Sequence, residues 1–347
     1  MFRMRIILVG FGVVGQSLVK LLLMRGKELA EDFKIHPKIV AVVDSGGASL
    51  NLKGLNLERV LAVKKEKGSV AMDEECGVKT VKASKIIEEV EAEVVVEATP
   101  TNIVDGEPAL THIKTALKTG KHVVTTNKGP LALAMPALME LAEYNNVLLR
   151  FSGCVGGGTP ILDFAKKCLQ GDKILSFRGI LNGTTNYILT KMTYENISFE
   201  DALAEAQKAG YAETDPSMDV DGYDSACKLV ILANWILGLK TVLKDVKIEG
   251  IRKITLKDVR DALDKGCEVK LIASAEEGGN LKVSPQLIPR SHPLCVGGVL
   301  NAVTFVSKYA GEETVIGRGA GGIETASAIL RDLLAIKQDI SLRSTYS

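Results

Sequence analysis

A glycine-rich hexapeptide near the start of the chain constrains the fold more strongly than any other feature of the sequence. The motif Gly10-x-Gly12-x-x-Gly15 follows an apolar run at residues 5–9 and precedes an amphipathic segment at 13–24. The first glycine allows a tight turn, the second lets a pyrophosphate approach the backbone, and the third lets a helix pack closely on a strand. We therefore predict a strand, a turn and a helix that bind a dinucleotide at the helix N-terminus. The alternative is a tight turn without a ligand.

Alternating strand and helix segments follow this turn. Short runs rich in valine lie at 39–44, 93–98, 121–125 and 146–150, and helices are predicted at 107–119 and 130–144. Strands that are apolar on both faces and separated by helices are typical of a parallel sheet covered by helices. Residues 1–150 are therefore predicted to form a doubly wound α/β dinucleotide-binding domain. Between 45 and 92 we expect a long loop, one helix and a weak edge strand, with the charged run 64–67 on a solvated helix face.

The pattern changes after residue 150, where glycines at 153 and 156–158 mark a break. Helices are predicted at 159–169, 184–192, 199–209 and 224–237, the first of them with Thr159 as N-cap and Pro160 as its first residue. Strands are predicted at 174–181, 268–276, 281–288, 299–306 and 314–317. This order indicates a second, α+β domain with a mixed sheet. A last helix is predicted at about 322–337.

Composition excludes several classes of protein. A length of 347 residues suggests two domains. Lys and Arg number 43 and Asp and Glu 42, so the formal net charge is +1 and nucleic acid is not an expected partner. No C-x-x-C pair and no metal-ligand spacing of histidines occurs, so we expect no metal site built from side chains, and free thiols in a reducing compartment. No apolar stretch reaches the roughly 18 residues of a membrane span, which predicts a cytoplasmic protein with no membrane partner.

Polar residues follow several predicted strands, at the edge of the sheet where doubly wound domains bind ligands. Asp44 ends the second strand, where an acid bonds a ribose 2′-hydroxyl and repels a 2′-phosphate; the alternative is that Asp44 caps the next turn. Lys53, Lys64 and Lys65 lie downstream within reach of a 2′-phosphate, so the choice between NAD and NADP stays open. Lys128 follows the strand at 121–125, which places it beside a cofactor or substrate.

The densest group of ionisable residues lies between Glu213 and Lys228, where five acids fall within twelve residues. A calcium loop with its glycine at Gly222 is excluded, because Lys228 then occupies the position that requires a bidentate glutamate. Asp224 and Lys228 stand four residues apart on one face of a predicted helix. A lysine between acids and an apolar core is a plausible proton donor, and nearby carboxylates suit a substrate ammonium group. The alternative is a solvated acidic turn in which Asp221 or Asp224 is an N-cap.

The chain resembles the homoserine dehydrogenases. The segments GFGVVG, TTNKGPLA, VGGGTPI, LNGTTNYIL, AGYAETDPSMDVDGYDSACKL and GRGAGGIETASAIL occur in the order found in that family, and the similarity covers essentially the whole chain. The resemblance implies reduction of L-aspartate 4-semialdehyde to L-homoserine with NADPH or NADH, a step toward threonine, isoleucine and methionine. It also implies a Rossmann-like nucleotide domain and a second, catalytic and dimerisation domain at 151–313. A C-terminal segment, 314–347, is expected to return to the nucleotide domain, and the expected partner is a second copy of the chain in a homodimer.

The resemblance also assigns roles to residues. Lys228 matches the family's proton donor and Lys128 its second essential lysine, and these two are expected to meet when the domains close. The family's acids that bind the substrate or orient the lysines correspond in this chain to Glu213, Asp219 and Asp224. Positions that touch the cofactor are matched by Phe11, Val13, Val14, Thr99, Thr126 and Gly322.

One departure from the family concerns a monovalent cation. Many members carry a glutamate shortly before the glycine loop that helps to bind it, and the corresponding residue here is Ser152. Carbonyl groups of Val155, Gly157 and Thr159 remain as candidate ligands, without a metal-binding side chain.

Three alternatives to this function stay open from the sequence. A different amino-acid dehydrogenase on the same scaffold is the nearest. A regulatory protein that binds NAD(P) without chemistry, and a structural dimer module, explain Lys128 and Lys228 less well.

Overall fold

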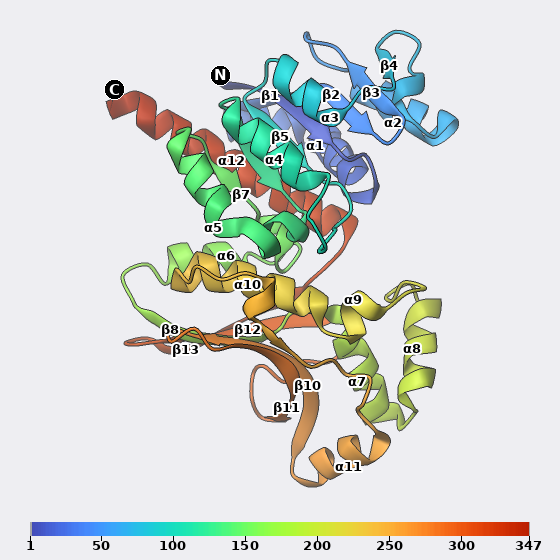
Figure 1. The fold of residues 1–347 in the computed structure, drawn as a ribbon, viewed down its shortest axis with the longest axis vertical. Coiled ribbons are helices and arrows are strands. Elements are labelled where there is room, and N and C mark those ends of the chain that lie inside the picture. The colour runs from blue at the N-terminus through green and yellow to red at the C-terminus, as the bar shows by residue number, and fades with distance from the viewer. Residues whose placement is uncertain (1, 347) are drawn as a thin grey trace. The chain divides into compact units, whose positions relative to one another are not determined.

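The computed structural model describes residues 2–346, and the side chains of residues 4–341, as two compact units (Figure 1). Unit 1 contains the chain up to Cys154 and again from Gly321 onward, and unit 2 contains Val155–Ala320. The chain therefore crosses between the units twice.

Unit 1 is built on a seven-stranded sheet in the order β4-β3-β2-β1-β5-β6-β7. The strands β1 (Phe2–Val9), β2 (Ile35–Asp44), β5 (Val94–Glu97), β6 (His122–Thr125) and β7 (Leu149–Arg150) are parallel. At one edge, β3 (Gly47–Leu50) and β4 (Gly77–Lys79) run antiparallel. Since β1 is followed in sequence by β2 on one side and paired with β5 on the other, the strand order reverses at β1, as in doubly wound folds.

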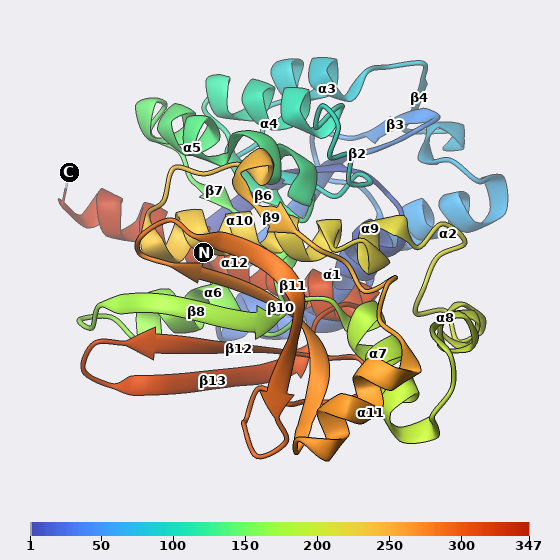
Figure 2. The same ribbon diagram turned by 60° about the horizontal axis from the view of Figure 1, so that its bottom comes forward.

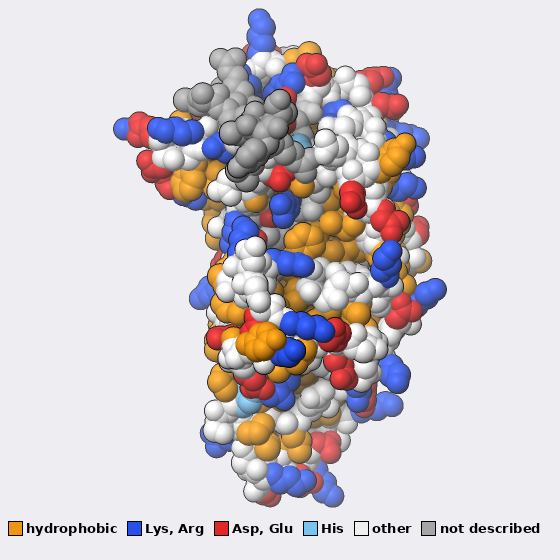
Figure 3. All heavy atoms as spheres, turned by 90° about the vertical axis from the view of Figure 1, so that its left-hand side faces the viewer, with side chains coloured by type: hydrophobic (Ala, Val, Ile, Leu, Met, Phe, Trp, Pro, Cys, Tyr) orange, Lys and Arg blue, Asp and Glu red, His pale blue; other side chains and the backbone are white. Residues whose placement is uncertain are grey.

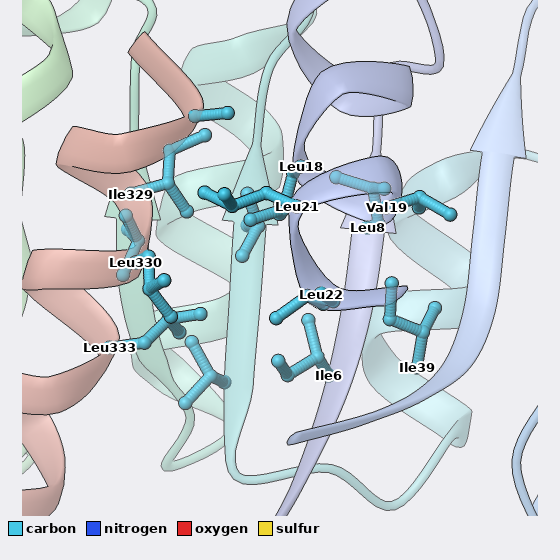
Figure 4. Packing of buried hydrophobic residues seen from close by; sticks show 14 of the residues in the cluster. Ile6, Leu8, Leu18, Val19, Leu21, Leu22, Ile39, Ile329, Leu330 and Leu333 are labelled. Carbon is cyan, nitrogen blue, oxygen red and sulfur yellow. The ribbon is translucent and has the colours of Figure 1, made fainter. Parts of the chain in front are cut away.

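Helices cover both faces of this sheet. On one face α1 (Val13–Glu31) packs beside the last helix, α12 (Gly322–Tyr346), and on the other α4 (Ala109–Lys118) packs between α3 (Ala83–Glu89) and α5 (Lys128–Tyr144) (Figure 1). Leu18, Leu21 and Leu22 of α1 meet Ile329 and Leu333 of α12 above the valine- and isoleucine-rich strands (Figure 4). This apolar layer joins the two ends of the chain in one core. The parallel, doubly wound α/β architecture expected from the sequence is confirmed.

The segment 45–92 contains more regular structure than the expected loop, helix and edge strand. It forms β3, helix α2 (Leu57–Lys67), a 3₁₀ turn (Val70–Met72), β4 and α3. The two short strands are stabilised by pairing with β2 and with each other, which a single segment does not reveal. The charged run at 64–67 lies in the last turn of α2, but the expectation of a fully solvated face is wrong for Lys64, whose side chain is largely buried.

Unit 2 is an α+β unit with a mixed six-stranded sheet in the order β13-β12-β8-β10-β11-β9. Strands β8 (Ile174–Ile180), β10 (Cys267–Glu276), β11 (Leu281–Pro289), β12 (Leu300–Ser307) and β13 (Gly311–Arg318) are antiparallel, and β9 (Lys247–Ile248) is parallel to β11. Figure 2 shows β8, β12 and β13 side by side, with β10 and β11 curving away from them. The helices of the unit are α6 (Ile161–Asp163), α7 (Gly183–Glu195), α8 (Phe199–Lys208), α9 (Ser217–Val220), α10 (Tyr223–Leu237) and α11 (Leu256–Asp264).

Three boundaries differ from the sequence-based expectation. The helix expected at 159–169 is a single turn, α6, that continues as a π-helix (Phe164–Cys168), and Pro160 rather than Thr159 is its N-cap residue. The chain re-enters unit 1 at Gly321 and not at 314, because residues up to Arg318 pair with β12. The last helix extends to Tyr346 instead of ending near 337, and its apolar side packs on the core of unit 1 as far as Ile340.

The structure also shows the distribution of surface charge, the hydropathy of the helices and the state of the cysteines. Basic and acidic side chains alternate over the face drawn in Figure 3, as the near-zero net charge suggests. Within the described residues no helix is long and apolar enough to cross a membrane. None of the six cysteines, all within the described residues, is part of a disulfide.

Candidate functional site

The glycine-rich turn lies between β1 and α1, and its three glycines serve different purposes. Gly10 adopts φ +96°, and a Cβ there would overlap the Ala98 carbonyl at the end of β5. A Cβ at Gly15 would collide with the carbonyl oxygen of Gly10. Gly12, by contrast, has an ordinary φ of −82°, and a Cβ there would meet no atom within 4 Å. The fold therefore explains Gly10 and Gly15, while Gly12 leaves open space in front of α1.

That open space fits a dinucleotide pyrophosphate. No side chain of the described residues caps α1 at Gly12, so the first N–H groups of the helix are available to an anion. The turn also lies at the carboxyl ends of β1 and β5, where the strand order reverses and doubly wound folds bind their ligands. Both observations support the dinucleotide interpretation over an empty turn.

The other residues expected to touch the cofactor surround this turn in different ways. The side chain of Phe11 is buried in the core of unit 1, so only its backbone faces the turn. Val14 is partly buried against the same core, whereas Val13 is 74% exposed. Gly322, at the start of α12, lies so close to α1 that a Cβ would come within 2.7 Å of Val13 Cγ1. Gly322 thus places the first residue of α12 beside the glycine-rich turn.

Asp44, at the end of β2, is held by the protein itself. Its carboxylate accepts hydrogen bonds from Lys64 Nζ (2.7 Å), Ser69 Oγ (2.7 Å) and the backbone N–H groups of Gly46 (2.9 Å) and Val70 (3.1 Å). Burial opposes ionisation of this carboxyl, but the four hydrogen bonds outweigh it and hold its pKa below the ordinary value. The geometry favours the alternative in which Asp44 caps the turn over a direct bond to a ribose hydroxyl.

Asp44→Asn is expected to lower the free energy of unfolding by about 1–3 kcal/mol at pH 7, because charge-assisted bonds to a buried group are lost. The depressed pKa stabilises the folded state above the unfolded-state pKa, and this contribution disappears as pH falls through the folded pKa. The stability difference should therefore shrink below about pH 4 in urea titrations. Unchanged stability with a raised KM for NAD would instead support the ribose interpretation.

Lys128 is the first residue of α5, and its position depends on the residue before it. Asn127 is buried and caps the helix, with its Oδ1 accepting the N–H of Gly129 (3.1 Å). Its Nδ2 donates to Thr99 O (3.1 Å), Thr99 Oγ1 (3.2 Å) and Pro100 O (2.9 Å), in the loop after β5. The half-buried Lys128 and Thr126 therefore lie at the carboxyl edge of the sheet, next to the loop that carries Thr99.

Unit 2 contains the second candidate cluster, centred on a buried lysine in α10. Lys228 Nζ donates to Asp224 Oδ2 (2.7 Å), one helical turn earlier, and to the backbone carbonyl of Leu181 (2.6 Å) at the end of β8. Asn182 Nδ2 donates to Asp219 Oδ1 (2.6 Å) and to Asp224 Oδ2 (2.9 Å). The lysine, the two acids and the amide form one connected group.

Three other acids of this segment have environments that differ from that of Asp224. Burial, and then the neighbouring Asp224 carboxylate, raise the pKa of Asp219 above its ordinary value. Glu213 lies in the exposed loop between α8 and α9, where Gln207 Nε2 donates to its backbone carbonyl (3.0 Å). Asp221 pairs with Arg252 and is not the N-cap of α10; Gly222 takes that place with φ +89°. The structure thus brings Asp219, Asp224 and Lys228 together and leaves Glu213 exposed on a neighbouring loop.

Asn182 belongs to this hydrogen-bonded cluster, although the sequence does not identify it as a candidate residue. The LNGTTN segment indicates only a tight turn or a loop near a ligand, with equal weight for both. In the structure Asn182 caps α7 through its Oδ1, which accepts the N–H of Thr185 (2.8 Å), while its Nδ2 holds both acids. An Asn followed by a helix-initiating Gly-Thr pair is the signal that could have identified it.

Ser152 and one of the three carbonyl groups considered for a monovalent cation make other contacts. Ser152 donates its hydroxyl to Asp332 Oδ1 (2.6 Å) and its N–H to Asp332 Oδ2 (2.8 Å), both within unit 1. In unit 2 the carbonyl of Thr159 accepts the N–H of Ile161 (2.9 Å). No group of three or more His, Cys, Asp and Glu side chains with metal-binding geometry occurs among the described residues.

The fold of unit 1 and its open, glycine-rich turn define the class of protein, which is an α/β protein with a Rossmann-type dinucleotide-binding domain. A separate α+β domain carries a buried lysine between acids. Comparisons with known proteins identify the family. Residues 10–152 match the model "Homoserine dehydrogenase, NAD binding domain" and residues 160–334 the model "Homoserine dehydrogenase".

Individual relatives agree over the full length. A homoserine dehydrogenase of Methanocaldococcus jannaschii is 47% identical over 333 residues, covering 96% of this chain and 98% of the relative. An NAD(+)-dependent homoserine dehydrogenase of Pseudomonas canavaninivorans is 39% identical over 100% of both chains. A solved hyperthermophilic archaeal homoserine dehydrogenase mutant in complex with NADPH matches with a TM-score of 0.86 and 30% identity, covering 97% of this chain and 98% of that chain. The chain belongs to the homoserine dehydrogenase family.

Proposed function

We propose that this protein interconverts L-aspartate 4-semialdehyde and L-homoserine with NAD or NADP, as a step in the biosynthesis of threonine, isoleucine and methionine. The observation that carries the proposal is the hydrogen-bonded group of the buried Lys228 and Asp224 with the partly buried Asp219 in unit 2, in a chain whose unit 1 has an open dinucleotide turn. Family membership supports the same reaction.

The proton chemistry follows from the contacts of Lys228. A lysine ammonium has three N–H donors. Within the described residues, two of them are directed to Asp224 and to the carbonyl of Leu181. The third is available for the carbonyl oxygen of an aldehyde. An ammonium held there stabilises the negative charge that develops on this oxygen and then supplies the proton.

The acids of the site have two roles in this mechanism. Asp224 bonds Lys228 directly and orients it, so that the ammonium is presented in one direction. Asp219 is kept in place by Asn182 and, with Glu213, is proposed to bind the ammonium group of the substrate. Lys128, in unit 1, is proposed as a second cation near the reacting carbonyl.

The dinucleotide, when bound, supplies or accepts the hydride. The N-terminus of α1 at Gly12 is proposed to hold its pyrophosphate, and the loops that carry Thr99, Thr126 and Lys128 to hold its nicotinamide end. Because Asp44 is saturated by internal hydrogen bonds, it does not by itself select NAD, and both cofactors remain candidates.

A homodimer in the cytoplasm is part of the proposal. In Figure 1, α6 and α10 lie on one side of strands β8 and β12, where α10 contacts β8, while α7 contacts β12. Leu287 of β11 and Ile316 of β13 are 48% and 46% exposed, but single exposed side chains do not identify an interface, so the homodimer is proposed from the resemblance to the family. Light scattering of the purified protein should give twice the mass of one chain; a monomer would contradict this part.

The reaction is tested by assaying purified protein for L-homoserine oxidation with NAD and NADP side by side. Turnover with at least one cofactor, and a clear preference for L-homoserine over other hydroxy- and amino acids, is expected. Preference for another amino acid would support a different dehydrogenase on the same scaffold. Tight dinucleotide binding without turnover on any substrate would support a regulatory protein.

Glu213→Gln tests whether the Glu213 carboxylate binds the ammonium group of the substrate. The change keeps the side-chain volume and removes one charge, and a charge-assisted bond contributes about 1.5–3 kcal/mol, so KM for homoserine should rise roughly tenfold or more. The dinucleotide KM should stay constant, because Glu213 lies in unit 2. An unchanged homoserine KM would show that Glu213 is not a substrate ligand.

A further inference from the structure

We propose that Glu97, a fully buried carboxylate at the end of β5, is the positioning residue for Lys128; this rests on the catalytic role proposed for Lys128. Glu97 has 0% exposure and ends a strand that lies between β1 and β6, so its side chain is closed off from solvent and from a ligand bound at the surface. A buried carboxylate is costly unless it is fully hydrogen-bonded. The hydrogen-bond partners of Glu97 therefore indicate which groups the carboxylate positions.

Two threonine hydroxyls bind this carboxylate from neighbouring loops. Thr99, after β5, donates both its hydroxyl and its backbone N–H (3.2 Å) to Glu97 Oε1. Thr125, at the end of β6, donates its hydroxyl to Glu97 Oε2 (3.4 Å). His112 of α4 lies behind them, with Nδ1 3.5 Å from Oε1. Glu97 thus connects the loops at the carboxyl ends of β5 and β6.

The same two hydroxyls accept hydrogen bonds from Asn127. Thr99 Oγ1 accepts from Asn127 Nδ2 (3.2 Å), and Thr125 Oγ1 accepts from the Asn127 backbone N–H (3.0 Å). A hydroxyl has only one proton to donate, and a carboxylate can only accept. Because Glu97 takes the proton of each hydroxyl, the lone pairs of both must face Asn127. The carboxylate therefore sets the orientation of both hydroxyls toward Asn127.

Asn127 transmits this arrangement to Lys128. It is the N-cap of α5, and Lys128 is the first residue of that helix. The next residue, Gly129, packs so tightly on the loop after β5 that a Cβ would collide with the carbonyl oxygen of Asn102. The first turn of α5 is thus attached to the loop that Glu97 orders, and the backbone of Lys128 has little freedom to shift independently.

Glu97→Gln is expected to lower kcat about 10- to 100-fold, the loss that follows misplacement of a reacting group by about 1 Å. A glutamine offers one acceptor and one donor, so one of the two threonine hydroxyls must reverse or lose its bond. The KM for homoserine should change little, and the dinucleotide Kd should rise no further than it does in Lys128→Ala, since Glu97 acts on the cofactor only through Lys128 and the loop that carries Thr99. A purely structural role would lower the melting temperature and leave kcat of the folded enzyme unchanged.

A double-mutant cycle with Lys128→Ala separates the possibilities. If Glu97 acts through Lys128, then Glu97→Gln should cause no further loss of kcat in the Lys128→Ala enzyme. If the kcat losses of the two single variants multiply in the double variant, or if Glu97→Gln leaves kcat unchanged, the positioning role of Glu97 is wrong. Neither result contradicts the role of Lys128. A Lys128→Ala enzyme with full kcat would contradict the role of Lys128 itself, and the positioning role with it.

Two further variants test whether the loss of kcat is caused only by a loss of stability. Asn127→Asp keeps the cap oxygen for Gly129 but removes the amide donors to Thr99 and Pro100, and should reproduce the loss of kcat. Glu93→Gln is the matched control at the opposite end of β5, where the carboxylate pairs with Arg5. Burial opposes ionisation of Glu93, but hydrogen bonds from Arg5 outweigh it and keep the pKa low, so this variant should lose stability but retain kcat. A loss of kcat in Glu93→Gln equal to that in Glu97→Gln would overturn the proposal.

Discussion

Replacing Lys228 by alanine is expected to lower kcat by roughly 10²–10⁴, the usual contribution of a placed acid or base. The ammonium bonds Asp224 directly and has one donor beyond those given to Asp224 and Leu181. The dinucleotide Kd should not change, because the glycine-rich turn belongs to unit 1. Steady-state kinetics and a fluorescence titration of the dinucleotide give both quantities on the same preparation.

Two companion variants make this test specific. Removing the lysine leaves Asp224 buried without this cation, so Lys228→Ala also loses stability, and kcat must be measured well below the melting temperature. Lys128→Ala should lose activity and also bind the dinucleotide less tightly, since Lys128 lies at the carboxyl edge of the sheet that holds the cofactor. A near-normal kcat in Lys228→Ala would assign the proton to Lys128 or to water instead.

Gly12→Val is expected to weaken dinucleotide binding, because the pyrophosphate can no longer make hydrogen bonds at this turn. Each charge-assisted hydrogen bond contributes about 1.5–3 kcal/mol, so each lost bond should raise the Kd at least about tenfold. The side chain of valine would fill the space in front of α1, where a Cβ on Gly12 has no protein atom within 4 Å. The backbone φ of −82° is ordinary for valine, so the fold itself should tolerate the change. Isothermal titration with NAD and NADP, together with a melting curve, measures both effects.

Gly15→Ala supplies the contrast for this experiment. A Cβ at Gly15 collides with the carbonyl oxygen of Gly10, so this variant should lose stability first and cofactor binding only as a consequence. If Gly12→Val binds the dinucleotide as the unmodified protein does, the turn does not hold the pyrophosphate.

Features encoded by local spacing could be predicted from the sequence. The glycine turn depends on three positions within six residues, and the contact between Lys228 and Asp224 depends on the four-residue helical spacing. The parallel sheet follows from apolar strands that alternate with helices. The family resemblance is confirmed by the similarity to known homoserine dehydrogenases.

Features that depend on distant partners could not be predicted in this way. Asp44 ends its strand as expected, but its bonds to Lys64, Ser69 and Val70 form only when α2 and the following 3₁₀ turn fold back onto β2. In the sequence, Glu97 is simply a charge that follows a run of valines. Only the pairing of β5 with β6 brings Thr125 to it. The roles of these carboxylates are therefore tertiary properties.

Hydride transfer between the nicotinamide and carbon 4 of the substrate, with proton donation by Lys228, is the central step of the proposed reaction. The most direct measurement supplies the protein with L-aspartate 4-semialdehyde and NAD(P)H deuterated at the transferable position, and analyses the product by mass spectrometry. The predicted product is L-homoserine with one deuterium on carbon 4, formed much more slowly by Lys228→Ala. Homoserine without deuterium, or no product from the unmodified protein with either cofactor, would contradict the proposed reaction.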